Sequence, residues 1–162
     1  MSLRCNAGRV KAALLAAVLL TAAPFALARP AQGPAMELVQ RQQLGSNLKT
    51  IALATAQQTE TFAMLASKVG APKAKTLVSK ELDSHAREFA PKWNQNLADI
   101  YARHFTADEL ASLAAEGKKS KYADKMVAQQ GAIGGEMRRA STPILISYVT
   151  ASMKTALSKA AK

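Results

Sequence analysis

The chain has few side chains suited to covalent or metal chemistry. It contains one cysteine, Cys5, and two histidines, His85 and His104, among 162 residues. Cys5 lies inside a predicted N-terminal export signal, so the exported part contains no cysteine. Disulfides, thiol catalysis, iron–sulfur clusters and cysteine zinc sites are therefore excluded for that part.

Acidic residues are also scarce, with 11 Asp and Glu against 22 Lys and Arg and a net charge of +11. The predicted signal holds three bases and no acid, which leaves 22 − 3 − 11 = +8 after export. Such a cation attracts anionic partners. Outside the cytoplasm these are acidic polysaccharide, lipid head groups or acidic proteins. The alternative is that the lysines only keep a soluble domain in solution.

Common catalytic motifs are missing as well. The sequence has no Gly-x-Ser-x-Gly elbow. The glycine-rich stretch from Gly131 to Gly135 lacks a preceding strand and the Lys-Ser/Thr of a P-loop. We therefore predict no cofactor.

The N-terminus has the pattern of a secretory signal peptide. Arg4, Arg9 and Lys11 precede an apolar run over residues 12–23, and Ala-Leu-Ala at 26–28 suits cleavage. A membrane anchor is the alternative, but a spanning helix needs about 20 apolar residues, and proline and arginine end this run early. Periplasmic location in a Gram-negative bacterium follows from this interpretation. We predict a signal peptide at 1–28, a flexible leader at 29–34 and a single helical domain at 35–162.

The rest of the chain has a helical pattern. No stretch alternates apolar and polar residues as a half-buried strand would, and the abundant Ala, Leu, Lys, Gln and Glu favour helix. Apolar residues recur at three- and four-residue steps, as at Trp93, Leu97 and Ile100. One helix should begin near Ala35, and residues 48–69 should form the next. We predict an all-α compact bundle of about five to seven helices.

Glycine and proline mark further helix boundaries. Gly70 should close one helix and Pro72 should open the next. Pro91 is expected to kink or split that helix. Thr142 and Pro143 have the pattern of an N-cap followed by a proline at the first helical position, so the last helix is expected to restart there.

A capping box is predicted at Thr106-Ala-Asp-Glu109. The Thr106 hydroxyl can accept a hydrogen bond from the Glu109 amide, and the Glu109 carboxylate can accept one from the Thr106 amide. Phe105 and Leu110 occupy the two hydrophobic positions around this cap. The helix that follows should stop at Gly117.

The segment Ile100–Leu110, IYARHFTADEL, is similar to the hallmark of a family of exported bacterial helical proteins known only as domain of unknown function 2059. An upstream tryptophan and a final helix after a proline extend the resemblance, whose strong part covers residues 89–126. Residues 114–119 depart from the pattern because they lack the family's aromatic pair and proline. The resemblance implies a helical fold and an envelope location, but no reaction, cofactor or catalytic residue. The motif residues are Trp93, Tyr101, His104, Phe105, Thr106, Glu109 and Leu110.

His85 and Glu88 have the i, i+3 spacing of two metal ligands on one helix. A zinc site usually needs at least three protein ligands, and nothing in the sequence brings Asp83 or His104 to this pair. We therefore predict no metal site. His85 is interpreted as a core or boundary histidine bonded to a carbonyl, and His104 as part of a joint between two helices.

The acids around His85 alternate with bases. Glu81, Asp83 and Glu88 are expected to form exposed ion pairs with neighbours such as Lys80 and Arg87, worth at most about 1 kcal/mol each. Paired carboxylates for hydrolysis are not indicated. An enzyme of unrecognised type is kept as an alternative.

Basic residues cluster after the capping-box helix. Tyr122 is the only aromatic residue inside this cluster, so stacking on bases is not indicated and nucleic acid is not an expected partner. The alternative to a contact surface is a solvated turn. The candidate contact residues are Lys118, Lys119, Lys121, Lys125, Arg138 and Arg139.

The leading hypothesis is a non-enzymatic periplasmic domain that binds an envelope or protein partner. A second hypothesis is a carrier of a small apolar ligand, with an apolar pocket between the Trp93 helix and the last helix. The lysine-rich last helix could also associate with a membrane surface. Burial of Trp93 and Phe89 would place them in the core, and exposure would favour a binding groove.

Overall fold

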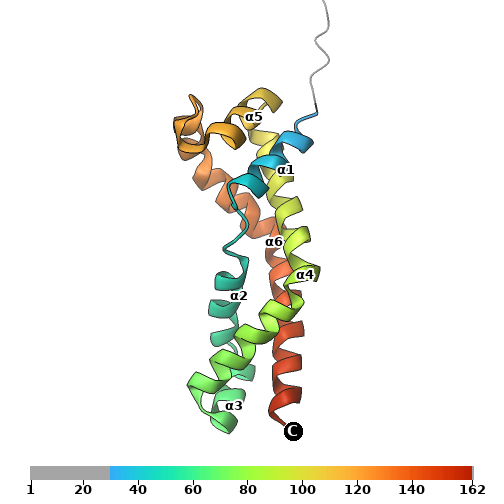
Figure 1. Cartoon of the computed structure of the whole chain (residues 1–162). Helices are drawn as coiled ribbons and strands as arrows, with labels where there is room; N and C mark the ends of the chain where they lie inside the picture. Colours follow the sequence, from blue (N-terminus) through green and yellow to red (C-terminus); the bar gives the residue numbers. More distant parts are fainter. Residues whose placement is uncertain (1–29, 162) are drawn as a thin grey trace, which may run out of the picture.

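A computed structural model describes residues 30–161 (Figure 1). The predicted signal peptide and Arg29 lie outside this part. Over residues 30–161 the chain forms six α-helices, one short 3₁₀ helix and no strand, which confirms the all-α prediction. No helix in this range is both long and apolar enough to span a membrane. The elements are α1 (Gln32–Arg41), α2 (Leu48–Gln57), α3 (Glu60–Val69), α4 (Ala71–His104), α5 (Ala107–Glu116), η1 (Gly117–Lys119) and α6 (Ala123–Ala160).

Two long helices, α4 and α6, form the axis of an elongated molecule (Figure 1). They run antiparallel, because Glu81 near the start of α4 bonds to Lys159 near the end of α6, whereas Arg103 bonds to Glu136. Helices α1 and α5 pack together at one end, and α2 and α3 cover α4 and α6 toward the other. The short helices therefore close the two ends of a long helical pair.

The core follows the inner faces of α4 and α6. Leu82, Ile100 and Tyr148 are fully buried, and the rings of Phe89 and Tyr148 lie 5.2 Å apart. The Tyr148 hydroxyl donates a hydrogen bond of 2.7 Å to the Leu82 carbonyl. Trp93 and Phe89 are also buried. The two aromatic residues that could have formed an open groove are thus core residues.

The first two helices differ from the predicted boundaries. Helix α1 begins at Gln32, inside the segment expected to be a flexible leader. Pro34 is tolerated there because the first amides of a helix have no intrahelical acceptor. The predicted helix over 48–69 is two helices, α2 and α3. Thr59 separates them, since its hydroxyl accepts a hydrogen bond from the Phe62 amide and caps α3.

Neither internal proline splits its helix, and α4 and α6 are continuous through Pro91 and Pro143. Both prolines are exposed, so water can reach the carbonyls that lose a partner. Figure 1 shows α4 bending in its lower half. The predicted restart of the last helix is wrong. The Thr142 hydroxyl does not cap a new helix but donates to the Arg138 carbonyl one turn earlier, at 2.6 Å.

The capping box is present as predicted. The Thr106 hydroxyl accepts a hydrogen bond from the Glu109 amide, and the Thr106 amide donates to the Glu109 carboxylate at 2.9 Å. Phe105 and Leu110 are buried on either side of the cap. Gly117 ends α5 with a φ of 56°, in the region that favours glycine.

Replacing Thr106 by alanine should lower the free energy of unfolding by about 1 kcal/mol, because the amide of Glu109 loses its acceptor at the start of α5. Thr106→Ser keeps the hydroxyl and is the matched control. Urea denaturation followed by circular dichroism measures both variants. Equal stabilities for the two would contradict the capping role.

Candidate functional site

The predicted basic surface lies at the end of the molecule formed by α1 and α5. Lys118 and Lys119 lie in η1, and the Lys121 ammonium sits 5.1 Å from the centre of the Tyr122 ring. The Lys125 ammonium is 2.7 Å from a Glu109 carboxylate oxygen. Residues 107–125 hold four lysines and four acids, so this segment is locally neutral. Its charge does not distinguish it as an anion-binding surface.

The two arginines of the prediction lie elsewhere. Arg138 and Arg139 are exposed on α6, 13 residues beyond Lys125. At 1.5 Å per residue this separation is about 20 Å. The structure therefore does not bring the six predicted contact residues together.

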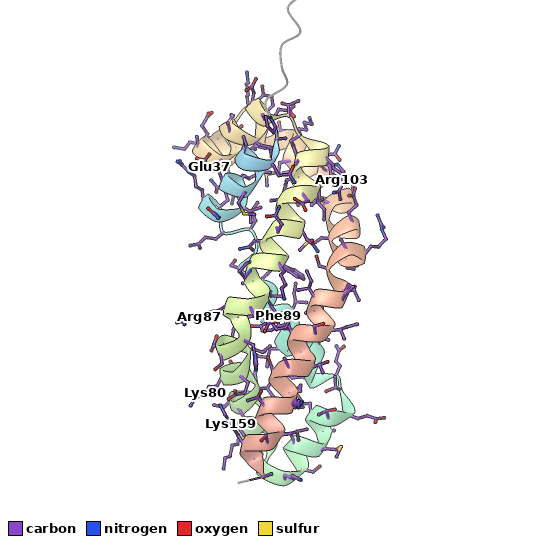
Figure 2. All side chains as sticks on the ribbon, turned by 90° about the vertical axis from the view of Figure 1, so that its right-hand side faces the viewer. Glu37, Lys80, Arg87, Phe89, Arg103 and Lys159 are labelled. Carbon is purple, nitrogen blue, oxygen red and sulfur yellow. The ribbon has the colours of Figure 1, made fainter. Side chains whose placement is uncertain are left out.

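A different group of bases gathers at the opposite end, where α3, the start of α4 and the end of α6 meet (Figure 1). Figure 2 labels Lys80 and Lys159 near this end, far from Arg103. Residues 60–83 and 146–161 together contain six lysines and three acids, Glu60, Glu81 and Asp83, and the last two are each paired with a lysine. Five of these lysines are exposed and form no ion pair within residues 30–161, and we call them the lysine-rich end. They are Lys68, Lys73, Lys75, Lys80 and Lys154.

The sixth lysine of this region, Lys159, pairs with Glu81. The ammonium lies 2.7 Å from a Glu81 oxygen, and Glu81 is only 1% exposed. The prediction of an exposed ion pair at Glu81 is therefore wrong. The residue lies on the inner face of α4 between Val78 and Leu82, which are fully buried. The other two acids of the group do form exposed pairs, with Lys49 and Lys92.

The histidines do not share a site. His85 and His104 are 19 residues apart on α4, which corresponds to about 28 Å. His85 is partly buried, and its Nε2 lies 3.2 Å from the Thr155 hydroxyl rather than from a carbonyl. In the part of the chain that the structure describes, no three His, Cys, Asp or Glu side chains group as a metal site requires.

His104 holds α4 against α6. Its Nδ1 is 3.1 Å from the Gln129 amide oxygen, and its Nε2 is 2.7 Å from a Glu136 oxygen. Arg103 donates to the other Glu136 oxygen at 2.7 Å. The hydrogen bond from Arg103, followed by that of His104, lowers the pKa of Glu136 below its usual value. This group therefore stabilises the fold near neutral pH, and its contribution is lost as the carboxylate protonates in acid.

The motif residues from Tyr101 to Leu110 lie at the same end, whereas Trp93 lies further along α4. Tyr101 and Phe105 are buried with their ring centres 5.9 Å apart, and the Lys125 ammonium is 5.0 Å from the Phe105 ring centre. Burial raises the pKa of Glu109, but hydrogen bonds from Lys125 and Thr106 outweigh it and hold that pKa below its usual value. The motif that carries the family resemblance is thus a structural joint between α4, α5 and α6.

A cavity of about 220 Å³ lies beside Trp93, between α2, α4 and α6. Its lining includes Ile51, Met137 and Leu145, together with Arg138. This is the place at which the ligand-carrier hypothesis expects an apolar pocket. The Trp93 indole N–H is buried and has no hydrogen-bond acceptor among the described residues.

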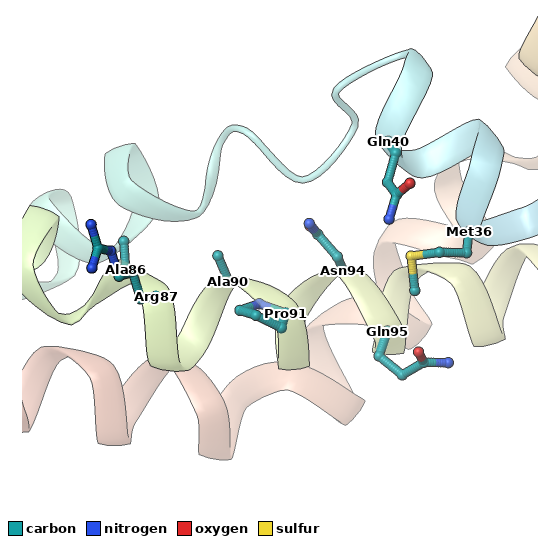
Figure 3. Close-up of a pocket in the computed structure, with 8 residues that line it drawn as sticks. All are labelled: Met36, Gln40, Ala86, Arg87, Ala90, Pro91, Asn94 and Gln95. Carbon is teal, nitrogen blue, oxygen red and sulfur yellow. The ribbon is translucent and has the colours of Figure 1, made fainter.

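A wider groove of about 560 Å³ lies on the other side of α4 (Figure 3). Met36 and Gln40 of α1 face Ala90 and Asn94 of α4 across it. Arg87 is its only charged lining residue. The groove has no pair of acid–base groups, so nothing in it indicates a reaction.

The chain matches no family model, no curated protein and no solved structure. The resemblance to the exported helical family therefore stays a prediction based on the segment around Thr106.

Proposed function

We propose that this chain is an exported, non-enzymatic helical domain that binds an anionic component of the bacterial envelope. The observation that carries this proposal is the lysine-rich end, where five exposed lysines lack an ion-pair partner within residues 30–161. Like charges gathered at one end of a molecule raise the local positive potential and attract anions. Export rests on the N-terminal pattern, and an envelope location also agrees with the family resemblance.

The arrangement of polar groups favours binding over catalysis. Each histidine is engaged in a contact between α4 and α6, and the two are far apart. Burial raises the pKa of Tyr101, so that phenol stays protonated at neutral pH and has no free phenolate to act as a base. An anionic polymer, lipid head group or acidic protein remains compatible with the surface.

Neutralising the lysine-rich end should abolish most of the binding to envelopes. The test variant is K68Q/K73Q/K75Q/K80Q, and the control is K118Q/K119Q/K121Q/R139Q, which removes the same charge from the originally predicted surface. A lysine near an anionic surface contributes about 1 kcal/mol, so we expect the test variant to bind at least about tenfold more weakly than the control. Co-sedimentation with washed bacterial envelopes measures both. If both variants lost the same amount of envelope binding, the binding would depend on net charge alone. Unchanged binding of the test variant would refute the proposal.

The cavity beside Trp93 favours a second candidate function, a carrier of a small apolar ligand. Ligand pockets usually measure about 300–1,000 Å³, so this cavity alone suits only a small group. A larger ligand must use neighbouring surface as well.

A further inference from the structure

Two cavities follow one another along α6 on the side covered by α2 and α3. The first is the 220 Å³ cavity beside Trp93, which ends at Leu145. The second, of about 370 Å³, begins at Val149 and is lined by Met153 and Leu157. Leu145 and Val149 are four residues apart, so they are neighbours on the helix surface. The two cavities therefore lie one after the other on the same face of α6, and we call this face with its two cavities the α6 groove.

The apolar lining of the α6 groove extends along the helix axis. Leu145 and Leu157 are 12 residues apart on α6, a distance of about 18 Å. Ile146 is 57% exposed and lies one turn from Thr150, which lines the second cavity. An unbranched hydrocarbon chain is long enough to reach from one cavity to the other across Leu145 and Val149, whereas a compact ligand would fill only one of them.

The charged residues of the groove are all basic. Arg138 lines the first cavity and Lys154 lines the second, and no acidic residue lines either. Arg138 makes no ion pair among the described residues and is exposed. A guanidinium binds a carboxylate through charge-assisted hydrogen bonds. A ligand oxygen beside Trp93 would also supply the acceptor that the buried indole N–H lacks.

We propose that the α6 groove binds a single-chain amphiphile with an anionic head, of the fatty-acid class. The carboxylate pairs with Arg138, and the hydrocarbon chain runs past Leu145 and Val149 toward Leu157. This inference rests on the second candidate function, the ligand carrier, and adds the length and charge of the ligand.

The protein carries its own reporter, because Trp93 is its only tryptophan and lines the groove. Titration of the full-length exported protein with hexadecanoate below its micelle concentration should shift Trp93 emission. Hexadecanol, with the same chain and an uncharged head, should bind about tenfold more weakly, since it loses the charge-assisted bond. Dodecanoate should also bind more weakly than hexadecanoate, by about fourfold for each buried methylene removed.

Arg138→Gln should reduce hexadecanoate affinity by about tenfold, to that of hexadecanol. Arg139→Gln removes the same charge from the adjacent residue, which does not line the groove, and should leave the affinity unchanged. Thermal melting followed by circular dichroism confirms that both variants fold. Equilibrium dialysis with labelled hexadecanoate gives a second readout that does not depend on fluorescence.

The outcomes separate the inference from the carrier function. If hexadecanol binds as tightly as hexadecanoate and Arg138→Gln changes neither affinity, the carrier function stands and the anionic head group is refuted. If neither compound binds by fluorescence or by dialysis, both are refuted. A tenfold preference for hexadecanoate that disappears in Arg138→Gln but persists in Arg139→Gln supports the assignment.

Discussion

Replacing Trp93 by alanine is expected to lower the free energy of unfolding by about 4 kcal/mol. Burial of large aromatic side chains contributes heavily to core stability, and Trp→Ala substitutions in cores cost about 3–5 kcal/mol. Trp93 is 6% exposed and lies on α4 facing α6 and the loop after α1, where Gly45 lies close to its ring. A domain of this size is stable by about 5–15 kcal/mol, so the loss should be visible as a large shift of the denaturation midpoint.

Two matched variants make the result specific. Trp93→Phe keeps an aromatic ring and removes an indole N–H that has no acceptor. It should therefore lower the free energy of unfolding clearly less than Trp93→Ala does. Ile146→Ala removes a large apolar side chain that is 57% exposed, and should stay within about 0.5 kcal/mol of the wild type. Guanidinium denaturation followed by far-ultraviolet circular dichroism measures all three. A cost for Trp93→Ala no larger than that for Ile146→Ala would contradict the burial of Trp93.

Replacing Lys159 by alanine is expected to lower the free energy of unfolding by about 3 kcal/mol. The substitution leaves the Glu81 carboxylate buried without its cation, and removing one partner of a buried ion pair typically costs about 3–5 kcal/mol. The lower end of that range applies because the Lys159 side chain is half exposed, at 50%. The reverse change, Glu81→Gln, leaves a lysine that can turn to water and should cost less.

The double variant Glu81→Gln/Lys159→Ala provides the control. In the Glu81→Gln background no buried charge is left behind, so the added Lys159→Ala substitution should cost less than about 0.5 kcal/mol. A double-mutant cycle from the denaturation midpoints gives the coupling energy. If Lys159→Ala lowers the free energy of unfolding equally in the wild type and in Glu81→Gln, the Glu81 carboxylate is not buried against Lys159 in solution.

Some helix caps and helix ends could be predicted from local signals in the sequence. The capping box at Thr106 and the helix stops at Gly70 and Gly117 depend on residues within four positions of each other, and all three are present. Thr59 gives an equally local signal, but the apolar spacing from Leu48 to Leu65 suggests one helix and hides it. Thr142 and Pro143 show the opposite error, because the same pair can cap a new helix or bond backward within an existing one.

Features that depend on packing could not be predicted from the sequence. Glu81 is surrounded in sequence by polar and apolar residues alike, and only the contact between α4 and α6 buries it against Lys159. The lysine-rich end joins residues from three helices, and Lys80 and Lys154 are 74 positions apart, whereas the sequence draws attention to the run at 118–121. Helix α5 and the first turn of α6 contain four acids. The segment that includes the run at 118–121 therefore has no excess positive charge.

Three glycines, at positions 131, 134 and 135, lie in the first third of α6. Each glycine weakens a helix by about 1 kcal/mol relative to alanine, so the hydrogen bonds of α6 are least protected there and local fraying should start at this point. Helix α4 has no glycine between Ala71 and His104. We therefore expect the soft segment of α6 to lie close to the joint with Arg103 and His104, so that the part of α6 beyond residue 135 stays packed on α4 when the first turns of α6 fray.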